Sequence, residues 1–178
     1  MSFYGGFSTV RAKFGIPDTG SLHFRNHGYY GQASFRYNMP VYPLSRFLQE
    51  VAAGLDYKRM NNNLEFGGAP VFSKNVNLFQ AMGSYNIGYE SRHLIATWEM
   101  ELFGSFAVFL PDQSNAAYQT LRPYAKSRYV YGRTSFALTH YFCSWAQYSL
   151  FLRGQAASTN LLPSEEFGVG GYDTVRGY

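Results

Sequence analysis

Residues 94–102, LIATWEMEL, indicate the fold most clearly, because apolar and polar side chains alternate along them. The even-numbered positions carry Leu, Ala, Trp, Met and Leu, whereas Thr97, Glu99 and Glu101 lie at odd-numbered positions between them. A period of two residues is typical of a β-strand that has one apolar face and one polar face. We therefore expect a strand here, with Glu99 and Glu101 on the face opposite Trp98.

The same alternation recurs along the chain. In residues 29–41, YYGQASFRYNMPV, Phe35 and Tyr37 alternate with Ser34 and Arg36. Comparable patterns predict strands at 47–58, 78–90, 128–140 and 145–155, and a weaker one at 6–14. The 178 residues include 16 Tyr, 16 Phe and 18 Gly, a composition that favours strands over helices. We therefore predict an all-β protein, an antiparallel meander of seven strands.

Composition excludes several classes of protein. The longest clean apolar run, residues 106–110, is far shorter than the roughly eighteen residues that a membrane-spanning helix requires. The 15 Lys and Arg residues are spread singly, so the net charge of +4 does not predict nucleic-acid binding. Cys143 is the single cysteine, and it makes neither an internal disulfide nor a metal site. We expect no cofactor and no metal.

The predicted connections alternate between long and short. Long connections are expected at 17–28, 59–75 and 103–127, and short turns at 42–46, 91–93 and 141–144. Transmembrane β-barrels have this arrangement, with long extracellular loops and short periplasmic turns joining strands of about ten residues. A secreted β-sandwich also has alternating strands and is the structural alternative.

In a barrel, the polar face of each strand meets a water-filled lumen, so charged side chains are tolerated there without a packed partner. The charged residues that we expect to face the lumen are Arg36, Glu50, Asp56, Glu99, Glu101, Arg133 and Arg153. The apolar face, with Trp98, is expected to meet lipid.

The C-terminal segment 150–178, LFLRGQAASTNLLPSEEFGVGGYDTVRGY, carries a dense series of motifs. They are, in order, Gly154 and Gln155 at the end of a strand, Leu162, the run Glu165, Glu166 and Phe167, then Gly170 and Gly171, and finally Val175, Arg176, Gly177 and Tyr178. This series resembles the signature of the hemolysin secretion/activation proteins, the outer-membrane transporters of two-partner secretion. The two glutamates replace the acidic-Gln pair that is commoner in that family. The upstream strands also resemble the family's barrel, at lower specificity.

The resemblance implies a transmembrane barrel of sixteen strands in the bacterial outer membrane, preceded by periplasmic polypeptide-transport-associated (POTRA) domains. On that register, residues 1–178 form a partial barrel domain, approximately the fifth to the eleventh strand plus the sixth extracellular loop. The periplasmic domains and the closing strands are then absent from this chain. The implied function is a monomeric pore that exports a partner protein of hemolysin or adhesin type. The expected partners are that secreted polypeptide and outer-membrane lipid.

Residues 170–178 form the loop motif that the resemblance places in the lumen. Gly170 and Gly171 permit positive φ angles and a close approach to a wall, and Arg176 offers a planar fork that pairs with a carboxylate. The resemblance implies that this carboxylate lies on a later strand, so we expect the chain to be a fragment. The supporting positions of the loop are Gln155, Glu165, Glu166 and Phe167.

We expect no enzymatic activity. The four histidines, at 23, 27, 93 and 140, are isolated, and no set of carboxylates completes a metal site around them. Glu90, Ser91 and His93 fall in one tight turn, where neighbouring residues do not present the geometry of a catalytic triad. Two other transport-related functions remain as alternatives: a barrel-assembly factor of the same superfamily, and a passive porin, which would lack the loop motif.

Overall fold

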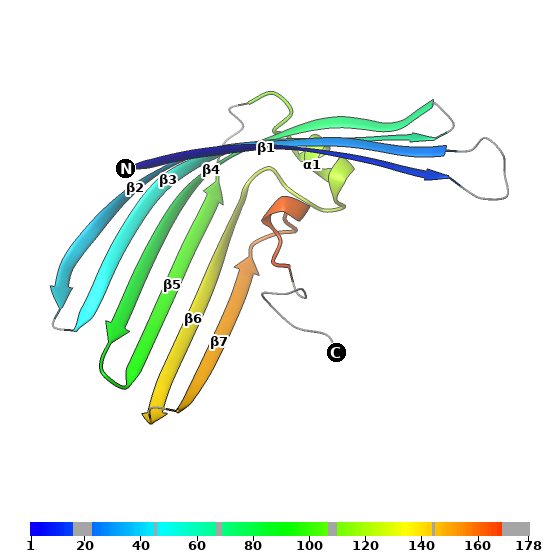
Figure 1. Cartoon of the computed structure of the whole chain (residues 1–178). Helices are drawn as coiled ribbons and strands as arrows, with labels where there is room; N and C mark the ends of the chain where they lie inside the picture. Colours follow the sequence, from blue (N-terminus) through cyan, green and yellow to red (C-terminus); the bar gives the residue numbers. More distant parts are fainter. Residues whose placement is uncertain (16–22, 45, 67–68, 107–109, 144, 169–178) are drawn as a thin grey trace.

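The structure is a computed structural model that describes residues 1–15, 23–44, 46–66, 69–106, 110–143 and 145–168. Within these ranges, only the backbone is described at 12–15, 23–27, 43–44, 62–66 and 69–74. Seven strands lie in one curled sheet in chain order, each antiparallel to the next (Figure 1). Their bounds are β1 Ser2–Gly15, β2 His23–Leu44, β3 Phe47–Phe66, β4 Ala69–Glu90, β5 Leu94–Ser105, β6 Tyr129–Cys143 and β7 Ala146–Ala157. The predicted all-β meander is therefore confirmed.

In the part of the chain that the structure describes, two short helical segments lie between and after the strands. Helix α1, Asn115–Leu121, forms part of the β5–β6 connection, and the 3-10 helix η1, Pro163–Glu165, follows β7. Ser114 caps α1, because its side-chain oxygen accepts a hydrogen bond from the backbone N–H of Ala117 at 3.2 Å. No helix in the described ranges is long and apolar enough to cross a membrane.

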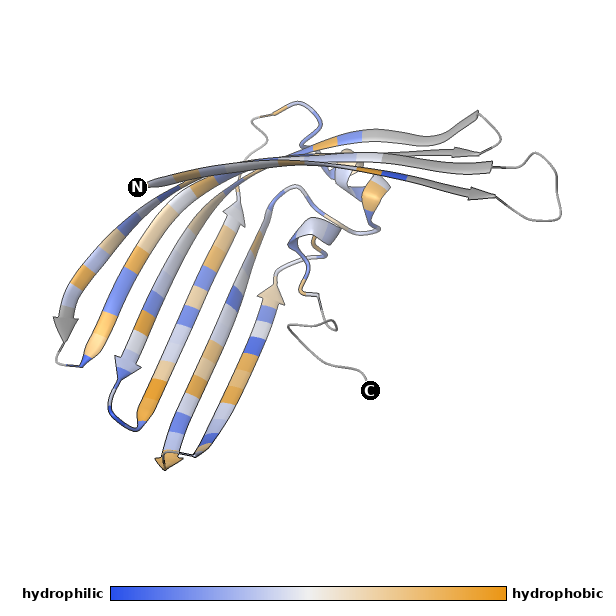
Figure 2. Cartoon of the chain, in the orientation of Figure 1, coloured by the Kyte–Doolittle hydropathy of each residue, from blue (hydrophilic) through white to orange (hydrophobic). Residues whose placement is uncertain are grey.

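The sheet has one apolar face and one polar face. On β2, Phe35, Tyr37 and Met39 are exposed, whereas Ser34 and Arg36, on either side of Phe35, are buried. Figure 2 shows the same alternation of hydrophobic and hydrophilic residues along β5, β6 and β7. A contiguous exposed apolar surface of this kind marks a site of interaction with a protein, a membrane or a ligand.

The register between strands aligns the polar positions into rows. One row consists of Glu50, Asn86, Glu99, Ser135 and Arg153, and the next of Ala52, Ser84, Glu101, Arg133 and Gln155. Alternate residues of a strand share a face, so Asp56 of β3 and Arg36, which pairs with Gly54, belong to the same side. We call this side of the sheet the polar face. The segment after β7 lies over it, within the curl of the sheet (Figure 1).

The strands differ from the predicted ones mainly in length. The expected long loop at 59–75 is wrong, because β3 continues to Phe66 and β4 begins at Ala69. Likewise, β2 begins at His23, inside the loop expected at 17–28, so His23 and His27 belong to a strand. The three predicted short turns are confirmed to within three residues, and the long and short connections do not alternate throughout.

Polar side chains explain why the alternation stops before the strands do. At the level of Asn61 and Asn75, the Asn61 amide donates to the Asn75 side-chain oxygen, which also accepts from the Tyr29 hydroxyl at 3.1 Å. Both asparagines are polar residues in paired strands, and the backbone ladder continues past them. The alternation of apolar and polar residues depends on what each face of a strand contacts, whereas the strand itself requires only paired backbone groups. A strand can therefore continue where the alternation has ended.

A small apolar core lies on the polar face, between the sheet and the segments that cover it. The sheet, which we call the wall, contributes Val76 and Leu78 of β4, Phe103 of β5, and Tyr129 and Tyr131 of β6. The covering residues are Ala117, Tyr118, Ala125, Leu161 and Leu162. The rings of Phe103 and Tyr131 stack with centroids 4.7 Å apart. This core fixes α1 and the segment after β7 against one patch of the sheet.

Candidate functional site

The segment after β7, residues 158–168, turns back over the polar face instead of extending away from it (Figure 1). Leu161 and Leu162 are buried in the apolar core, and Pro163 begins η1, where a missing N–H has no cost. The backbone N–H of Glu165 donates to the Leu162 carbonyl at 2.8 Å, which closes the short turn. This turn presents the Glu165 side chain to the sheet. We call residues 158–168 the returning segment.

Glu165 is completely buried, and its carboxylate is held by three side chains of the wall. Lys58 Nζ of β3 lies 2.5 Å from Oε1, while Oε2 accepts from the Tyr131 hydroxyl at 2.6 Å and from Gln80 Nε2 at 3.1 Å. The Ser164 hydroxyl donates to Oε1 at 3.0 Å. A charge this deeply buried requires a partner and several hydrogen bonds, and Glu165 has both.

The backbone of Glu165 is held as well as its side chain. Its carbonyl oxygen accepts from Arg133 Nη2 at 2.9 Å and from Gln155 Nε2 at 2.8 Å. One residue of the returning segment is therefore bound by side chains of β3, β4, β6 and β7. We call Glu165 with Lys58, Gln80, Tyr131, Arg133 and Gln155 the anchor site.

A second layer of polar contacts orients the residues of the anchor site. Gln80 donates to Asp56 Oδ2 at 3.3 Å and accepts from the Tyr129 hydroxyl at 2.8 Å, which fixes the orientation of its amide. Asp56 in turn forms an ion pair with Arg36 at 2.7 Å. The buried charges thus form a continuous network across β2, β3 and β4 to the returning segment.

Gly54 makes room for Arg36 in this network. A Cβ atom at Gly54 would lie 2.4 Å from the Phe35 carbonyl oxygen and 2.6 Å from Arg36 Cδ. Both distances are below those that real Cβ atoms adopt, and one neighbour is backbone. Arg36 reaches Asp56 by lying across the strand at a position where the neighbouring residue has no side chain.

The charge of Glu165 is stabilised by its surroundings. Burial alone raises the pKa of this carboxyl, but the Lys58 ammonium, with hydrogen bonds from Lys58, Tyr131 and Gln80, lowers it further than burial raises it. The pKa of Glu165 is therefore below its ordinary value of 4.5, and the side chain is a carboxylate at neutral pH.

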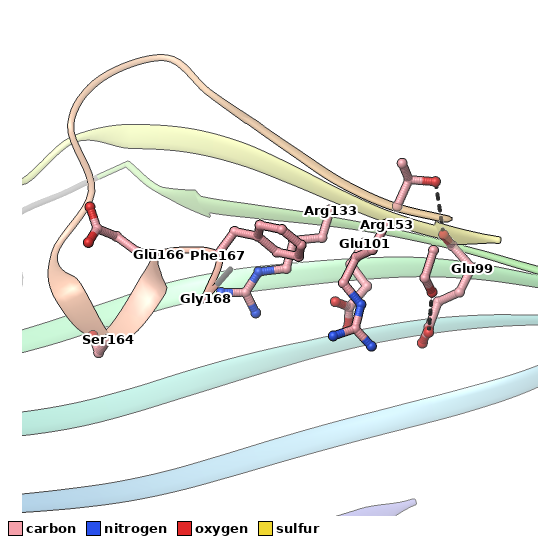
Figure 3. A pocket seen from close by; sticks show the side chains of 10 residues that line it. Glu99, Glu101, Arg133, Arg153, Ser164, Glu166, Phe167 and Gly168 are labelled. Atoms are coloured by element: carbon pink, nitrogen blue, oxygen red, sulfur yellow. Dashed lines mark hydrogen bonds between the residues drawn. The ribbon is translucent and has the colours of Figure 1, made fainter. Parts of the chain in front are cut away.

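A polar cavity of about 450 Å³ adjoins the anchor site. Figure 3 shows Glu101, Arg133 and Arg153 of the strands, with Phe167 and Gly168 of the returning segment beside them. Glu99 also lines the cavity and accepts a hydrogen bond from the Ser135 hydroxyl at 3.2 Å. Three carboxylates, of Glu99, Glu101 and Glu166, and two guanidinium groups, of Arg133 and Arg153, line this cavity, so its surface is polar and carries charges of both signs.

The structure places all seven of the predicted lumen-facing charges on the polar face, although it does not bring them into one cluster. Arg36 and Asp56 are buried in the network, Arg133 contacts the anchor site, and Glu99, Glu101 and Arg153 line the cavity. Glu50 lies in the row of Glu99 and is exposed. The role of these seven residues in a lumen remains a prediction.

The predicted supporting positions of the loop fall into two groups. Glu165 and Gln155 belong to the anchor site, whereas Glu166 forms an ion pair with Arg122 and Phe167 lines the cavity. The loop motif itself, Gly170, Gly171, Val175, Arg176, Gly177 and Tyr178, lies outside the described residues.

Sequence reasoning missed Lys58, Gln80 and Tyr131 as site residues. Lys58 and Gln80 are polar residues of predicted strands, and their position relative to Asp56 distinguishes them. Lys58 lies two residues after Asp56 on the polar face, and Gln80 is the residue of β4 that pairs with Asp56. The alternation in residues 128–140 places Tyr131 on the polar face, but nothing distinguishes it as a site residue among the 16 tyrosines of the chain. The partner of each of these residues depends on where the returning segment docks, and the periodicity of the strands does not predict that position.

No group of three or more His, Cys, Asp or Glu side chains that suits a metal ion occurs among the described residues. The chemistry of the anchor site is charge pairing and hydrogen bonding between a segment and a wall.

Comparison with known proteins identifies the family. Residues 32–178 match the family model described as haemolysin secretion/activation protein ShlB/FhaC/HecB. No curated protein and no solved structure matches the chain. The matched range includes all strands of the anchor site and the C-terminal motifs, and it supports a broad function in two-partner protein secretion with a secreted partner protein. From the extent of this match, the chain belongs to the family of haemolysin secretion/activation proteins.

Proposed function

We propose that the seven strands form part of the wall of a pore in the bacterial outer membrane, through which a partner polypeptide of hemolysin or adhesin type is exported. In this proposal the polar face lines the lumen, the exposed apolar face meets lipid, and the full-length protein acts as a monomer. Export through such a pore includes no catalytic step and requires no cofactor.

The faces of the sheet support this arrangement. Exposed Trp98, Leu102 and Leu152 suit a hydrocarbon environment, whereas the buried Arg36–Asp56 ion pair suits a polar interior. The Trp98 indole N–H, on the apolar side, donates to Thr134 Oγ1 at 2.8 Å, so this polar group has a partner within the protein. A polar group that faces lipid requires such an internal partner.

The single observation that carries the proposal is the anchor site. A pore for an unfolded polypeptide must be wide, yet the returning segment occupies the inner side of the wall. Glu165 is bound by side chains of four strands, and these contacts fix the position of the returning segment. Residues 158–168 are therefore kept from moving across the proposed lumen and blocking it. We propose that this fixed position is required for export.

The test compares Glu165→Gln with Glu90→Gln in the full-length protein. Glu165→Gln leaves Lys58 buried without an anion, which costs about 3–5 kcal/mol, so we expect secretion per folded barrel to fall at least about tenfold. Glu90 is exposed at the end of β4, and the same change there should leave secretion unchanged. Secreted partner is measured by immunoblot of the medium, and folded barrel by its heat-dependent mobility in gels.

Other outcomes separate the alternatives. Secretion by Glu165→Gln at the level of the unmodified protein would contradict the required role of the anchor site. A protein that passes small solutes but exports no polypeptide would be a passive porin. Loss of other barrel proteins from the membrane, with export intact, would indicate a barrel-assembly factor.

A further inference from the structure

The connection between β5 and β6 lies directly against the returning segment, although the two are far apart in sequence. Ala125 and Asn160 form a parallel β-bridge, and Asn160 Nδ2 donates to the Pro123 carbonyl at 3.1 Å. The Thr159 hydroxyl donates to the Tyr124 carbonyl at 3.4 Å. Three consecutive residues of one connection thus contact two of the other.

Apolar contacts continue this interface from the backbone bridge to the wall. Leu161 and Leu162 of the returning segment lie in the same buried core as Ala117 and Tyr118 of α1 and Ala125. Leu162 and Tyr118 have at most 1% of their surface exposed. Burying a leucine side chain fully contributes about 1.5–3 kcal/mol, so separating the two connections would expose a substantial apolar surface.

Helix α1 has attachments to the wall that do not involve the returning segment. The Tyr118 hydroxyl donates to the Asn77 carbonyl at 3.1 Å, and Asn77 Nδ2 donates to the Pro111 carbonyl at 2.8 Å. Gln113 Nε2 donates to Ser105 Oγ at 3.1 Å. Burial, followed by the negative charge of Glu165, raises the pKa of Tyr118, so its hydroxyl stays a donor at neutral pH.

An ion pair completes the interface on its exposed side. Arg122, just after α1, pairs with Glu166, and each side chain is more than a third exposed. Such a pair stabilises a protein by about 0–1 kcal/mol, so it contributes more to the orientation of the two connections than to the stability of their interface. The helix is therefore bound to the wall on one side and to the returning segment on the other.

We propose that residues 110–127, which include α1, position the returning segment, so that the two connections dock on the wall as one cooperative body. Glu165 then leaves its place only when α1 is released as well, and the anchor site and α1 support each other. The significance of this coupling for export rests on the proposed function, but the coupling itself is a property of the two connections and is tested without any secretion assay.

The test uses a spin label at Gly168 in full-length protein that carries Cys143→Ser. Gly168 is exposed, and a Cβ atom there would have no neighbour within 4 Å, so Gly168→Cys should be tolerated. Ala117→Asp places a carboxylate in the core against Leu161 and Leu162, and Ala116→Asp makes the same change on the exposed side of the helix. We expect the mobile fraction of the label to rise about tenfold or more in Ala117→Asp and to stay unchanged in Ala116→Asp.

A reciprocal measurement distinguishes coupling from simple damage. Two sites that stabilise each other must do so by the same factor in both directions. With the label moved to exposed Gln119 of α1, Glu165→Gln should therefore also raise the mobile fraction of the helix, although Glu165 lies outside it. An immobile label at Gln119 in a variant whose Gly168 label has become mobile would overturn the proposal.

If the Ala117→Asp protein does not insert into the membrane, a set of variants with milder effects tests the same proposal. Arg122→Glu should raise the mobile fraction at Gly168 about two- to fivefold, in line with the small worth of an exposed pair. Combining it with Glu166→Arg restores the pair with reversed charges and should restore immobility. Arg128→Glu, an exposed site nearby, is the matched control. If Arg122→Glu and Arg128→Glu have equal effects, the proposal is wrong.

Discussion

Glu165 combines two properties that rarely coincide, a full negative charge and complete burial. An apolar pair of similar size would fill the same space at comparable stability, because desolvation offsets much of the attraction between buried charges. An apolar pair would not specify one position, however. The Lys58 ammonium and the Tyr131 hydroxyl require a carboxylate at one place between β3 and β6. We infer that the ion pair contributes mainly to the specificity of docking.

Acid should weaken this docking through Glu165. Its pKa is lowered in the docked state, so the carboxylate contributes stability that is fully present above its ordinary pKa of 4.5 and is lost as the pH falls through the lowered value. We expect unmodified protein to unfold at a higher temperature than Glu165→Gln at pH 7, with a difference that begins to shrink below pH 4.5 and disappears once the pH is below the lowered pKa of Glu165. Thermal unfolding of both proteins in detergent, from neutral to acid pH, measures it.

The comparison of the two proteins removes the contribution of every other carboxyl group, because both proteins contain the same ones. A difference that stays constant or grows on acidification would contradict the assigned ionisation of Glu165.

At the scale of the elements, sequence periodicity predicted all seven strands, and it predicted the polar and apolar faces of every strand except β1. It placed the turn at 91–93 correctly, because Ser91 and Arg92 interrupt two clear alternations. It failed for residues 59–66 of β3 and 69–77 of β4, where polar residues interrupt the alternation and the period of two disappears. Helix α1 has seven residues and its Ser114 cap resembles any loop serine, so no helical period could be recognised.

The anchor site was only partly predictable for a related reason. Glu165 and Gln155 were identified because a motif surrounds them, whereas Lys58 and Gln80 depend on contacts between residues 107 and 85 positions apart, respectively. Local patterns determine which face a residue occupies. They do not determine which distant segment covers that face.

The orientation of β7 gives a prediction at this scale. Leu152 is exposed on the apolar face, so Leu152→Arg should destabilise the proposed lipid-facing barrel by about 2–4 kcal/mol if it lies near the bilayer midplane. Ser149, three residues away, is exposed on the opposite face, and Ser149→Arg should have a small effect. The amount of folded barrel in the membrane, measured by heat-dependent gel mobility, tests both. Equal amounts in the two variants would show that the faces are assigned wrongly.

At the scale of the whole molecule, the sheet of the described residues is open. Its strands run in order from β1 to β7, so the outer edges of β1 and β7 have no partner strand in this arrangement. In lipid, each unpaired backbone group costs several kcal/mol, and only a closed barrel avoids that cost.

We therefore expect the isolated 178-residue polypeptide to form no stable conducting channel in planar bilayers. Current recordings with the purified chain test this, and a full-length family member serves as the positive control. Steady conductance from the isolated chain would mean that these strands close by themselves or by association of several copies.

The length of the β3–β4 hairpin has a mechanical consequence. Strands β3 and β4 contain 20 and 22 residues, and at about 3.3 Å per residue they are roughly 65 and 73 Å long. Tilted by about 40°, such strands rise about 50 Å, roughly twice the height of the apolar band of a barrel. Strand β4 pairs with β5 only from Ala81 onward, so the rest of the hairpin extends beyond β5, and Lys58 and Gln80 lie at the base of this extension. A sideways push at its tip, by another molecule or an attached bead, would be transmitted along paired backbone to the two side chains that hold Glu165.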